Sequence, residues 1–288
     1  MNGATANRPG CSLIGEKMKL VISIVYYDSG LTTLGQTLRS IVAALDHAVD
    51  QIEGLQTKLV VVDNGGILSQ MMDLVSRTVG ERSHEWMVLG TGGNIGYGAA
   101  HNLVILNEQS DYHLVINPDV EVIEDAFTKA IRYMQSHDNV GLLSPYSQNP
   151  EGYKQYLCKR YPAVLDLFLR GFAPRFMKRI FETRLQEYEM RWDLQDQALS
   201  KEVMASGCFM FVRYNVLHKV KGFSPDFFVY FEDFDLSIRI AKSSIIAYVP
   251  DVRIVHGGGN ASKKGLKHII MFAKSAFVFY HKHGWRWA

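Results

Sequence analysis

Cysteine, net charge and long apolar runs are all scarce in this chain of 288 residues. The three cysteines are odd in number, far apart and without metal-type spacing: Cys11, Cys158 and Cys208. We therefore expect a reducing, cytoplasmic setting rather than a disulfide framework. The formal net charge of +2 gives no reason to expect nucleic acid as a partner. No apolar run approaches the roughly 18 residues of a membrane-spanning helix.

Two common nucleotide-binding fingerprints are also missing. The loop after the first predicted strand, residues 26–30, reads Tyr-Tyr-Asp-Ser-Gly instead of G-x-G-x-x-G, and no G-x-x-x-x-G-K-[S/T] loop occurs. Rossmann dehydrogenases and P-loop enzymes are therefore poor candidates. A nucleotidyltransferase is disfavoured as well, because this loop carries no basic residue to bind a triphosphate.

Short β-rich runs alternate with helical spacings along most of the chain. Strands are expected at residues 19–25, 58–62, 85–89, 112–116, 141–144, 203–212, 245–249 and 252–255. Helices are expected at residues 31–45, 67–79, 98–107, 124–136, 232–242 and 265–283, with another from Tyr214. This order predicts an α/β fold with a mostly parallel, doubly wound sheet.

Two segments stand outside this alternation. Residues 1–17 lack the apolar core of a signal peptide and are expected to form a disordered tail, with Met18 as an alternative start. Residues 145–202 are expected to be a variable insertion, with a basic, aromatic helix that carries seven Lys or Arg against two Asp or Glu over 159–184. Such a helix can lie on an anionic membrane. A packing helix with a solvated basic face is the favoured alternative.

Polar residues follow several strands at the edge where open α/β sheets bind ligands. Asp63 ends one strand, where it can bind a ribose or base, or simply close an Asx-turn. The glycine-rich run at residues 92–98 precedes a helix, and this arrangement favours phosphate binding over a merely tight loop. Asn117-Pro118-Asp119 and His256 also end strands. A carboxylate with an imidazole suits a divalent ion, whereas a lone buried histidine needs no ligand.

The run Phe-Glu-Asp-Phe-Asp-Leu-Ser-Ile-Arg at residues 231–239 begins a helix with three acids. Acids there complement the helix dipole, and Asp235 can pair with Arg239. Glu232 and Asp233 are adjacent and project differently, so one of them is a candidate general base. Like-charge neighbours also raise the pKa of one member of such a pair.

Taken in chain order, these segments resemble the inverting family-two glycosyltransferases with a GT-A fold, especially the bacterial rhamnosyltransferase-like branch. The resemblance rests on Asp63, Gly-Asn-x-Gly-Tyr-Gly-x-x-x-Asn, Asn-Pro-Asp, Phe-Glu-Asp-x-Asp-Leu-x-x-Arg and a late Val-His. It covers roughly residues 19–283 and is weakest over 146–201. Residues 274–284 also resemble the end of rhamnosyltransferase-like members.

The resemblance implies a role for each matched residue. Asp63 would contact the nucleoside, and the nucleotide-sugar pocket would be lined by Asn94, Gly96, Tyr97, Asn102 and Asn117. Asp119 and His256 would hold Mn²⁺ or Mg²⁺, more weakly than a site with two carboxylates because Asn117 replaces the first acid of the DxD motif. Asp233 would be the catalytic base, with Glu232 as the second choice.

The implied reaction moves a sugar from a nucleotide-sugar donor to a hydroxyl of a glycan or lipid-linked glycan in bacterial surface polysaccharide (lipopolysaccharide) synthesis. The branch favours dTDP-L-rhamnose, with UDP- and GDP-sugars as alternatives. A non-catalytic member that binds nucleotide or glycan also stays open. With a lipid-linked acceptor, residues 170–179 would hold the enzyme peripherally at the inner membrane face.

Overall fold

The computed structural model describes residues 17–80, 82–171, 173–195, 198–201, 203–258 and 265–288. The tail expected at residues 1–17 lies, apart from Lys17, outside the described residues. The strands are β1 (Lys19–Tyr26), β2 (Gln56–Asp63), β3 (Glu85–Gly90), β4 (Tyr112–Ile116), β5 (Val120–Val122), β6 (Val140–Gln148), β7 (Lys154–Gln155), β8 (Cys158–Lys159), β9 (Leu199–Lys201), β10 (Met204–Ala205), β11 (Phe209–Arg213) and β12 (Ile245–His256). The helices are α1 (Leu31–Gln51), α2 (Leu68–Val79), α3 (Tyr97–Ile105), α4 (Ala126–Ser136), α5 (Val164–Gly171), α6 (Arg175–Ile180), α7 (Glu182–Tyr188), α8 (Tyr214–Lys219), α9 (Glu232–Ala241) and α10 (Leu266–His283).

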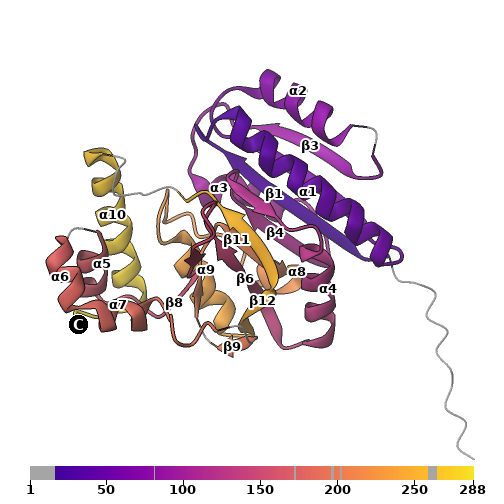
Figure 1. Ribbon diagram of the computed structural model, residues 1–288. Helices are drawn as coiled ribbons and strands as arrows, with labels where there is room; N and C mark the ends of the chain where they lie inside the picture. The colour runs from indigo at the N-terminus through magenta and orange to yellow at the C-terminus, as the bar shows by residue number, and fades with distance from the viewer. Residues whose placement is uncertain (1–16, 81, 172, 196–197, 202, 259–264) are drawn as a thin grey trace, which may run out of the picture.

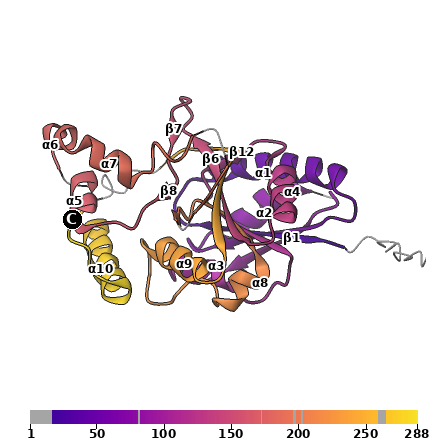
Figure 2. The same ribbon diagram turned by 90° about the horizontal axis from the view of Figure 1, so that it is seen from below.

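One large sheet runs through the molecule in the order β3-β2-β1-β4-β11-β6-β12-β5. Strands β3, β2, β1 and β4 are mutually parallel, and β11 is inserted antiparallel between β4 and β6. Helices α1, α2 and α4 cover one face, while α3, α8 and α9 cover the other (Figures 1 and 2). The predicted α/β class with a doubly wound, largely parallel sheet is confirmed.

The period of two in the first strand explains why both faces of the sheet are covered. Leu20, Ile22 and Ile24 of β1 belong to the core beneath α1, whereas Val21 and Val25 pack toward α3. All five side chains are buried. Burying a Val, Leu or Ile side chain contributes about 1.5–3 kcal/mol, so a strand that is apolar on both faces is stable only between two helical layers.

Two local predictions were wrong. The segment expected to hold one basic helix forms three short ones, α5, α6 and α7, because the first is followed by Ala173-Pro174 and proline cannot continue a helix. The two strands expected at residues 245–249 and 252–255 are one strand, β12. Its register against β6 shifts between Val249 and Arg253, so an irregularity absorbs the intervening proline.

The short helices α5, α6 and α7 lie beside α10 and together form a lobe away from the sheet (Figures 1 and 2). The carboxyl-terminal segment closes it, since the backbone amides of Val164 and Leu165 donate to the carbonyls of Arg286 and Trp287. A small apolar cluster that includes Leu167, Phe272 and Phe279 fills the space between the lobe and α9. No helix in the described part of the chain is long and apolar enough to cross a bilayer.

Candidate active site

The edge where β4 ends brings together residues that are far apart in the sequence. Asn117, Pro118 and Asp119 follow β4, and the Asn117 amide donates to the carbonyl of Cys208 at 2.9 Å. Because β11 runs antiparallel to β4, its beginning lies where β4 ends. The Ser206-Gly207 interruption before β11 therefore lies next to the Asn-Pro-Asp turn.

His256 is brought to Asp119 by backbone pairing. At the end of β12 it pairs with Val120 of β5, and the Gly257 amide donates to the Asp119 carbonyl at 3.0 Å. The His256 Nε2 atom then lies 3.6 Å from Asp119 Oδ1. The His256 Nδ1–H donates to Gln155 Oε1 at 3.2 Å, since the Gln155 amide nitrogen is itself a donor to the His256 carbonyl. This orientation leaves the lone pair of Nε2 facing Asp119.

The chemistry of this pair fits a divalent cation. Burial lowers the pKa of His256, although the Asp119 carboxylate opposes the change, so the imidazole is neutral at pH 7. A neutral imidazole oriented by a second hydrogen bond is the form that binds metals. No cluster of three His, Cys, Asp or Glu side chains suited to a metal occurs among the described residues. Mg²⁺ and Mn²⁺ sites commonly use one or two protein ligands completed by substrate phosphates and water.

Asp233 is held against the Ser206-Gly207 interruption from the start of α9. Its Oδ2 accepts from the Gly207 amide at 2.9 Å, and its Oδ1 accepts from the Phe234 amide at 2.9 Å. The Tyr97 hydroxyl donates to the Gly207 carbonyl at 2.7 Å. The backbone of Gly207 thus links α3 to α9. Burial raises the pKa of Tyr97, and the charges of Glu232, Asp233 and Asp119 raise it further.

Glu232 differs from its neighbour in having one carboxyl oxygen without a hydrogen-bond partner among the described residues. Its carboxyl is buried, and its Oε2 atom has no hydrogen bond in the described structure. Burial, together with the Asp233 charge, raises the pKa of Glu232 to about 8. Burial also raises the pKa of Asp233, but two backbone amides stabilise its ionised form. A single proton shared by the pair at pH 7 therefore resides on Glu232, and Asp233 is the carboxylate.

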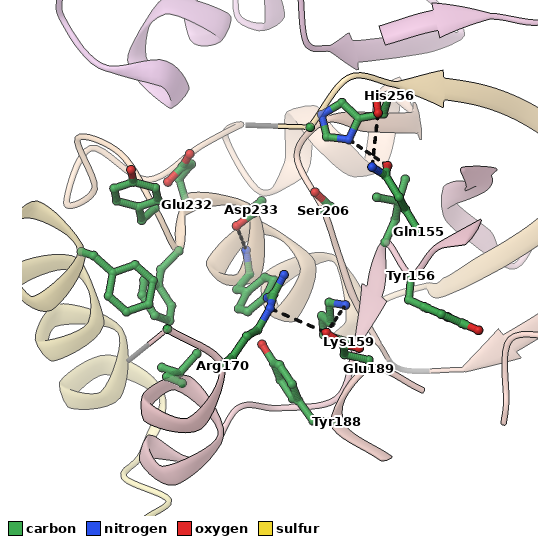
Figure 3. Close-up of a pocket in the computed structure, with 18 of the residues that line it drawn as sticks. Gln155, Tyr156, Lys159, Arg170, Tyr188, Glu189, Ser206, Glu232, Asp233 and His256 are labelled. Carbon is green, nitrogen blue, oxygen red and sulfur yellow. Dashed lines mark hydrogen bonds and ion pairs between the residues drawn. The ribbon is translucent and has the colours of Figure 1, made fainter. Parts of the chain in front are cut away.

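A cavity of about 860 Å³ opens in front of this pair. Glu232, Asp233, Ser206 and His256 line one side, and the other side is formed by residues of the 145–202 segment and by α10. Figure 3 shows Asp233 and Ser206 between His256 at one end and a group of charged side chains at the other. A reaction at Asp233 would therefore take place inside a walled pocket rather than on an open surface.

Sequence comparison points to one enzyme class. No protein-family model matches the chain. It is 25% identical over 268 residues to an N-acetylglucosaminyl-diphospho-decaprenol L-rhamnosyltransferase of Mycobacterium tuberculosis. The aligned region covers 88% of this chain and 83% of that protein. It is also 25% identical over 175 residues to the rhamnosyltransferase WbbL of Escherichia coli K12, over 58% of this chain and 62% of that one.

Structure comparison gives the fold. Staphylococcus aureus TarS superposes with a TM-score of 0.54 at 12% identity, over 85% of this chain and 62% of the TarS chain. GalNAc-T7, solved with UDP, GalNAc and Mn²⁺, superposes with a TM-score of 0.56 at 13% identity, over 83% of this chain and 43% of that one. The chain has the GT-A fold of these structures, and its sequence is similar to rhamnosyltransferases. The fold expected from the sequence and the resemblance to rhamnosyltransferases are thereby confirmed.

Within this fold, Asp63 closes a turn at the end of β2. Its Oδ1 accepts from the amides of Gly65 and Gly66 at 3.0 and 2.9 Å, the Asx-turn that the sequence left open as an alternative. The next residue, Asn64, organises the glycine-rich loop: its Nδ2 donates to Asn94 Oδ1 at 3.0 Å and its Oδ1 accepts from the Ile95 amide. A nucleoside contact by Asp63 would have to use the other carboxylate oxygen.

The glycine-rich loop packs closely against the segment that contains Phe223 and Phe228. A Cβ on Gly96 would lie 2.6 Å from the Phe228 carbonyl oxygen, and one on Gly98 would lie 2.7 Å from the Phe223 Cβ. The Tyr97 amide, the first of α3, donates to the Phe228 carbonyl at 3.0 Å. The Asn102 side chain binds both backbone polar groups of Phe223. The first amide of α3 therefore binds protein, and phosphate binding by the rest of this helix N-terminus stays a prediction.

The structure brings together some of the expected site residues and separates others. Glu232, Asp233 and His256 line the cavity, Asp119 adjoins it through His256, and Tyr97 adjoins it through Gly207. The remaining expected residues do not line this cavity: Asp63, Asn94, Gly96, Asn102 and Asn117. Asp235 has the structural role expected of it, because it pairs with Arg239 at 2.7 Å.

Sequence reasoning missed the residues that hold or face the site from the 145–202 segment. Gln155 is separated from His256 by 101 positions and sits on the two-residue strand β7, so no periodicity marks it. Lys159, Arg170 and Glu189 line the cavity. The sequence feature that indicates them is the excess of basic residues over 159–184, but such an excess is equally typical of a solvated basic face.

Proposed function

We propose that this glycosyltransferase moves L-rhamnose from dTDP-L-rhamnose to a hydroxyl of a lipid-linked glycan, with inversion at the anomeric carbon. The observation that carries the proposal is the Glu232–Asp233 pair, which faces a walled cavity beside the Asp119–His256 pair. The names of the two sequence relatives, both rhamnosyltransferases, support the donor sugar. A decaprenyl-diphosphate acceptor in one of those names supports a lipid-linked acceptor.

Asp233 is the proposed general base. Inverting transfer needs a carboxylate that removes the proton of the acceptor hydroxyl as that oxygen attacks the anomeric carbon. Asp233 is held in place by the Gly207 and Phe234 amides, which favour its ionised form. Glu232, whose pKa is raised to about 8 by burial and by Asp233, stays protonated and adds no second negative charge. No covalent intermediate is required, so no nucleophilic side chain is assigned.

Asp119 and His256 are the proposed ligands of Mn²⁺ or Mg²⁺. A bound divalent ion would supply charge neutralisation at the donor diphosphate. The chain itself contributes the oriented Nε2 lone pair of His256 and the Asp119 carboxylate, 3.6 Å apart. The residues proposed to bind the donor are unchanged: Asp63, Asn94, Gly96, Asn102 and Asn117. Tyr97 is proposed to hold the Gly207 backbone beside the base.

The domain organisation also belongs to the proposal. Residues 18–288 would form one GT-A domain, with 145–202 as an insertion that builds the acceptor side of the cavity. Phe176 and Ile180 on α6 are 67% and 72% exposed beside exposed Arg175 and Arg179. An apolar and basic surface of this kind is suited to peripheral contact with an anionic membrane, where a lipid-linked acceptor resides.

A thermal-shift screen of donors tests the proposal. dTDP-rhamnose, UDP-glucose, UDP-galactose and GDP-mannose would each be added with Mn²⁺ and with EDTA, beside dTDP, UDP and GDP alone. A donor at 100 times its Kd stabilises the native state by about 2.7 kcal/mol. We expect the largest stabilisation from dTDP-rhamnose with Mn²⁺. Equal shifts for a UDP- or GDP-sugar would reject the donor assignment, and no shift with any donor would favour a non-catalytic member.

A further inference from the structure

A cluster of three cations lines the part of the cavity farthest from His256. This basic cluster consists of Lys159, Arg170 and Arg191, all gathered around one carboxylate, Glu189. The Glu189 Oε1 atom lies 3.8 Å from Lys159 Nζ and 3.7 Å from Arg170 Nε, and its Oε2 lies 2.7 Å from an Arg191 nitrogen. Figure 3 shows Lys159, Arg170 and Glu189 together at the end of the cavity opposite His256.

The charges of the basic cluster do not balance. Two arginines and a lysine face a single acid; the Lys159 side chain is only 8% exposed, whereas those of Arg170 and Arg191 are 53% and 41% exposed. Burial lowers the pKa of Lys159 to about 7, Arg170 lowers it further, and Glu189 only partly opposes the change. A bound anion would favour the charged form of Lys159 and pair with the two arginines. The cluster therefore carries an excess of positive charge and is suited to an anion.

The surroundings of the cluster show which anion fits. Tyr188 and the cluster line the same cavity as Asp233, the proposed base. Burial raises the pKa of Tyr188, and Arg170 opposes the rise. The buried Tyr188 hydroxyl also has no hydrogen-bond partner in the described structure. Apolar side chains of α5 and α10, Leu167 and Phe272, line the same cavity. Farther along α10, Ile270 is 61% exposed.

We propose that the basic cluster binds the diphosphate of an isoprenoid-linked acceptor, whose lipid chain leaves the cavity between α5 and α10. This inference rests on the proposed function, because it assigns the acceptor side of the same site. The diphosphate supplies the negative charge that pairs with Arg170, Arg191 and protonated Lys159, and the Tyr188 hydroxyl supplies one more donor. An acceptor anchored there presents its first sugar toward Asp233, with the donor on the His256 side.

Titration with farnesyl diphosphate, a short isoprenyl diphosphate, tests the inference on the whole chain without knowledge of the acceptor sugar. We expect binding to the wild type, in the presence and absence of the nucleotide that the donor screen selects. Arg170→Gln and Arg191→Gln should each weaken it about tenfold, since each removes one half-exposed charged donor from the cluster. Arg160→Gln is the matched control, because Arg160 lies on the same segment but pairs with Asp193 outside the cavity lining.

Several outcomes would overturn the inference. These are no binding of farnesyl diphosphate to the wild type, equal binding to all variants, or equally tight binding of farnesol. Displacement by the nucleotide would assign the anion to the donor site. Binding of a short-chain phosphatidylglycerol as tight as that of farnesyl diphosphate would assign the cluster to phospholipid headgroups. The thermal stabilisation that the nucleotide-sugar donor gives should be the same in Arg170→Gln as in the wild type, because Arg170 is assigned to the acceptor. A wild type that no donor stabilises would contradict the proposed function, whereas a wild type that does not bind farnesyl diphosphate would contradict only the assignment of the basic cluster.

Discussion

The assignment of Asp233 rather than Glu232 as the base gives a prediction that two isosteric substitutions can test. Asp233→Asn removes the carboxylate that accepts from the Gly207 and Phe234 amides. Glu232→Gln replaces a buried carboxyl by a neutral amide of the same shape. If the shared proton resides on Glu232, the second change imitates the state that the native enzyme already has at pH 7.

The expected magnitudes follow from the pKa of Glu232. With burial and the Asp233 charge raising it to about 8, Glu232 is protonated in about nine of ten molecules at pH 7. Glu232→Gln should therefore keep kcat within a few-fold of wild type. A positioned general base contributes about 10²–10⁴-fold, or about 3–5 kcal/mol of transition-state stabilisation. Asp233→Asn should lose about that factor in kcat while its KM for the donor changes little.

The assay is initial-rate transfer across pH 5 to 9, with thermal unfolding of each variant to show that the fold persists. Ionisation of Glu232 should give the wild type an inflection near pH 8 that is absent from Glu232→Gln. The reasoning would be refuted if Glu232→Gln lost more activity than Asp233→Asn. It would also be refuted if the inflection persisted in Glu232→Gln.

Three further predictions concern the metal, the loop and the core. Asp119→Asn should abolish the difference between Mn²⁺ and EDTA in donor titrations, and an unchanged difference would remove Asp119 from the metal site. Gly96→Ala should destabilise the fold by about 1–3 kcal/mol in urea unfolding because its φ is +97°; Gly93→Ala, in open space at an ordinary φ, is the control and should have little effect. Burial lowers the pKa values of His101 and His113, the latter to about 3, so below pH 6.5 the unfolded chain binds more protons than the native one. Stability should therefore fall between pH 6.5 and 5, by about 1.6 kcal/mol from His113 alone, and a flat profile there would contradict neutral burial.

Local periodicity was sufficient to predict the sheet and the edge that carries the site. Parallel strands that end in polar residues place those residues at one edge, which is why Asp119 and His256 were expected near each other. The structure puts them 3.6 Å apart. Strand β11, which runs antiparallel between β4 and β6, brings Gly207 to the same edge. The sequence indicated Gly207 only as part of an interruption.

The acceptor side of the cavity could not be predicted because its contacts are not local. Lys159 and Glu189 are thirty positions apart and lie on irregular, short elements, where charge counting cannot distinguish a solvated face from a cavity wall. The same limit applies to the glycine-rich loop. Its glycines indicate a close approach, but the sequence alone does not show that the approaching group is the Phe228 carbonyl rather than a phosphate.

The Gly207 peptide shows how the fold itself positions the proposed base. Its amide binds Asp233 and its carbonyl accepts from Tyr97, so the start of α9 and the start of α3 are both held by the backbone of one residue, through the two peptide groups that meet at Gly207. A Cβ on Gly207 would lie 3.2 Å from the Asp233 Cβ, closer than ordinary contact. The proposed base thus takes its position from a break between β10 and β11, adjacent to the turn that carries Asp119. Because this break lies at the same sheet edge as the proposed metal ligands, the topology of the sheet places the proposed base and the proposed metal ligands together.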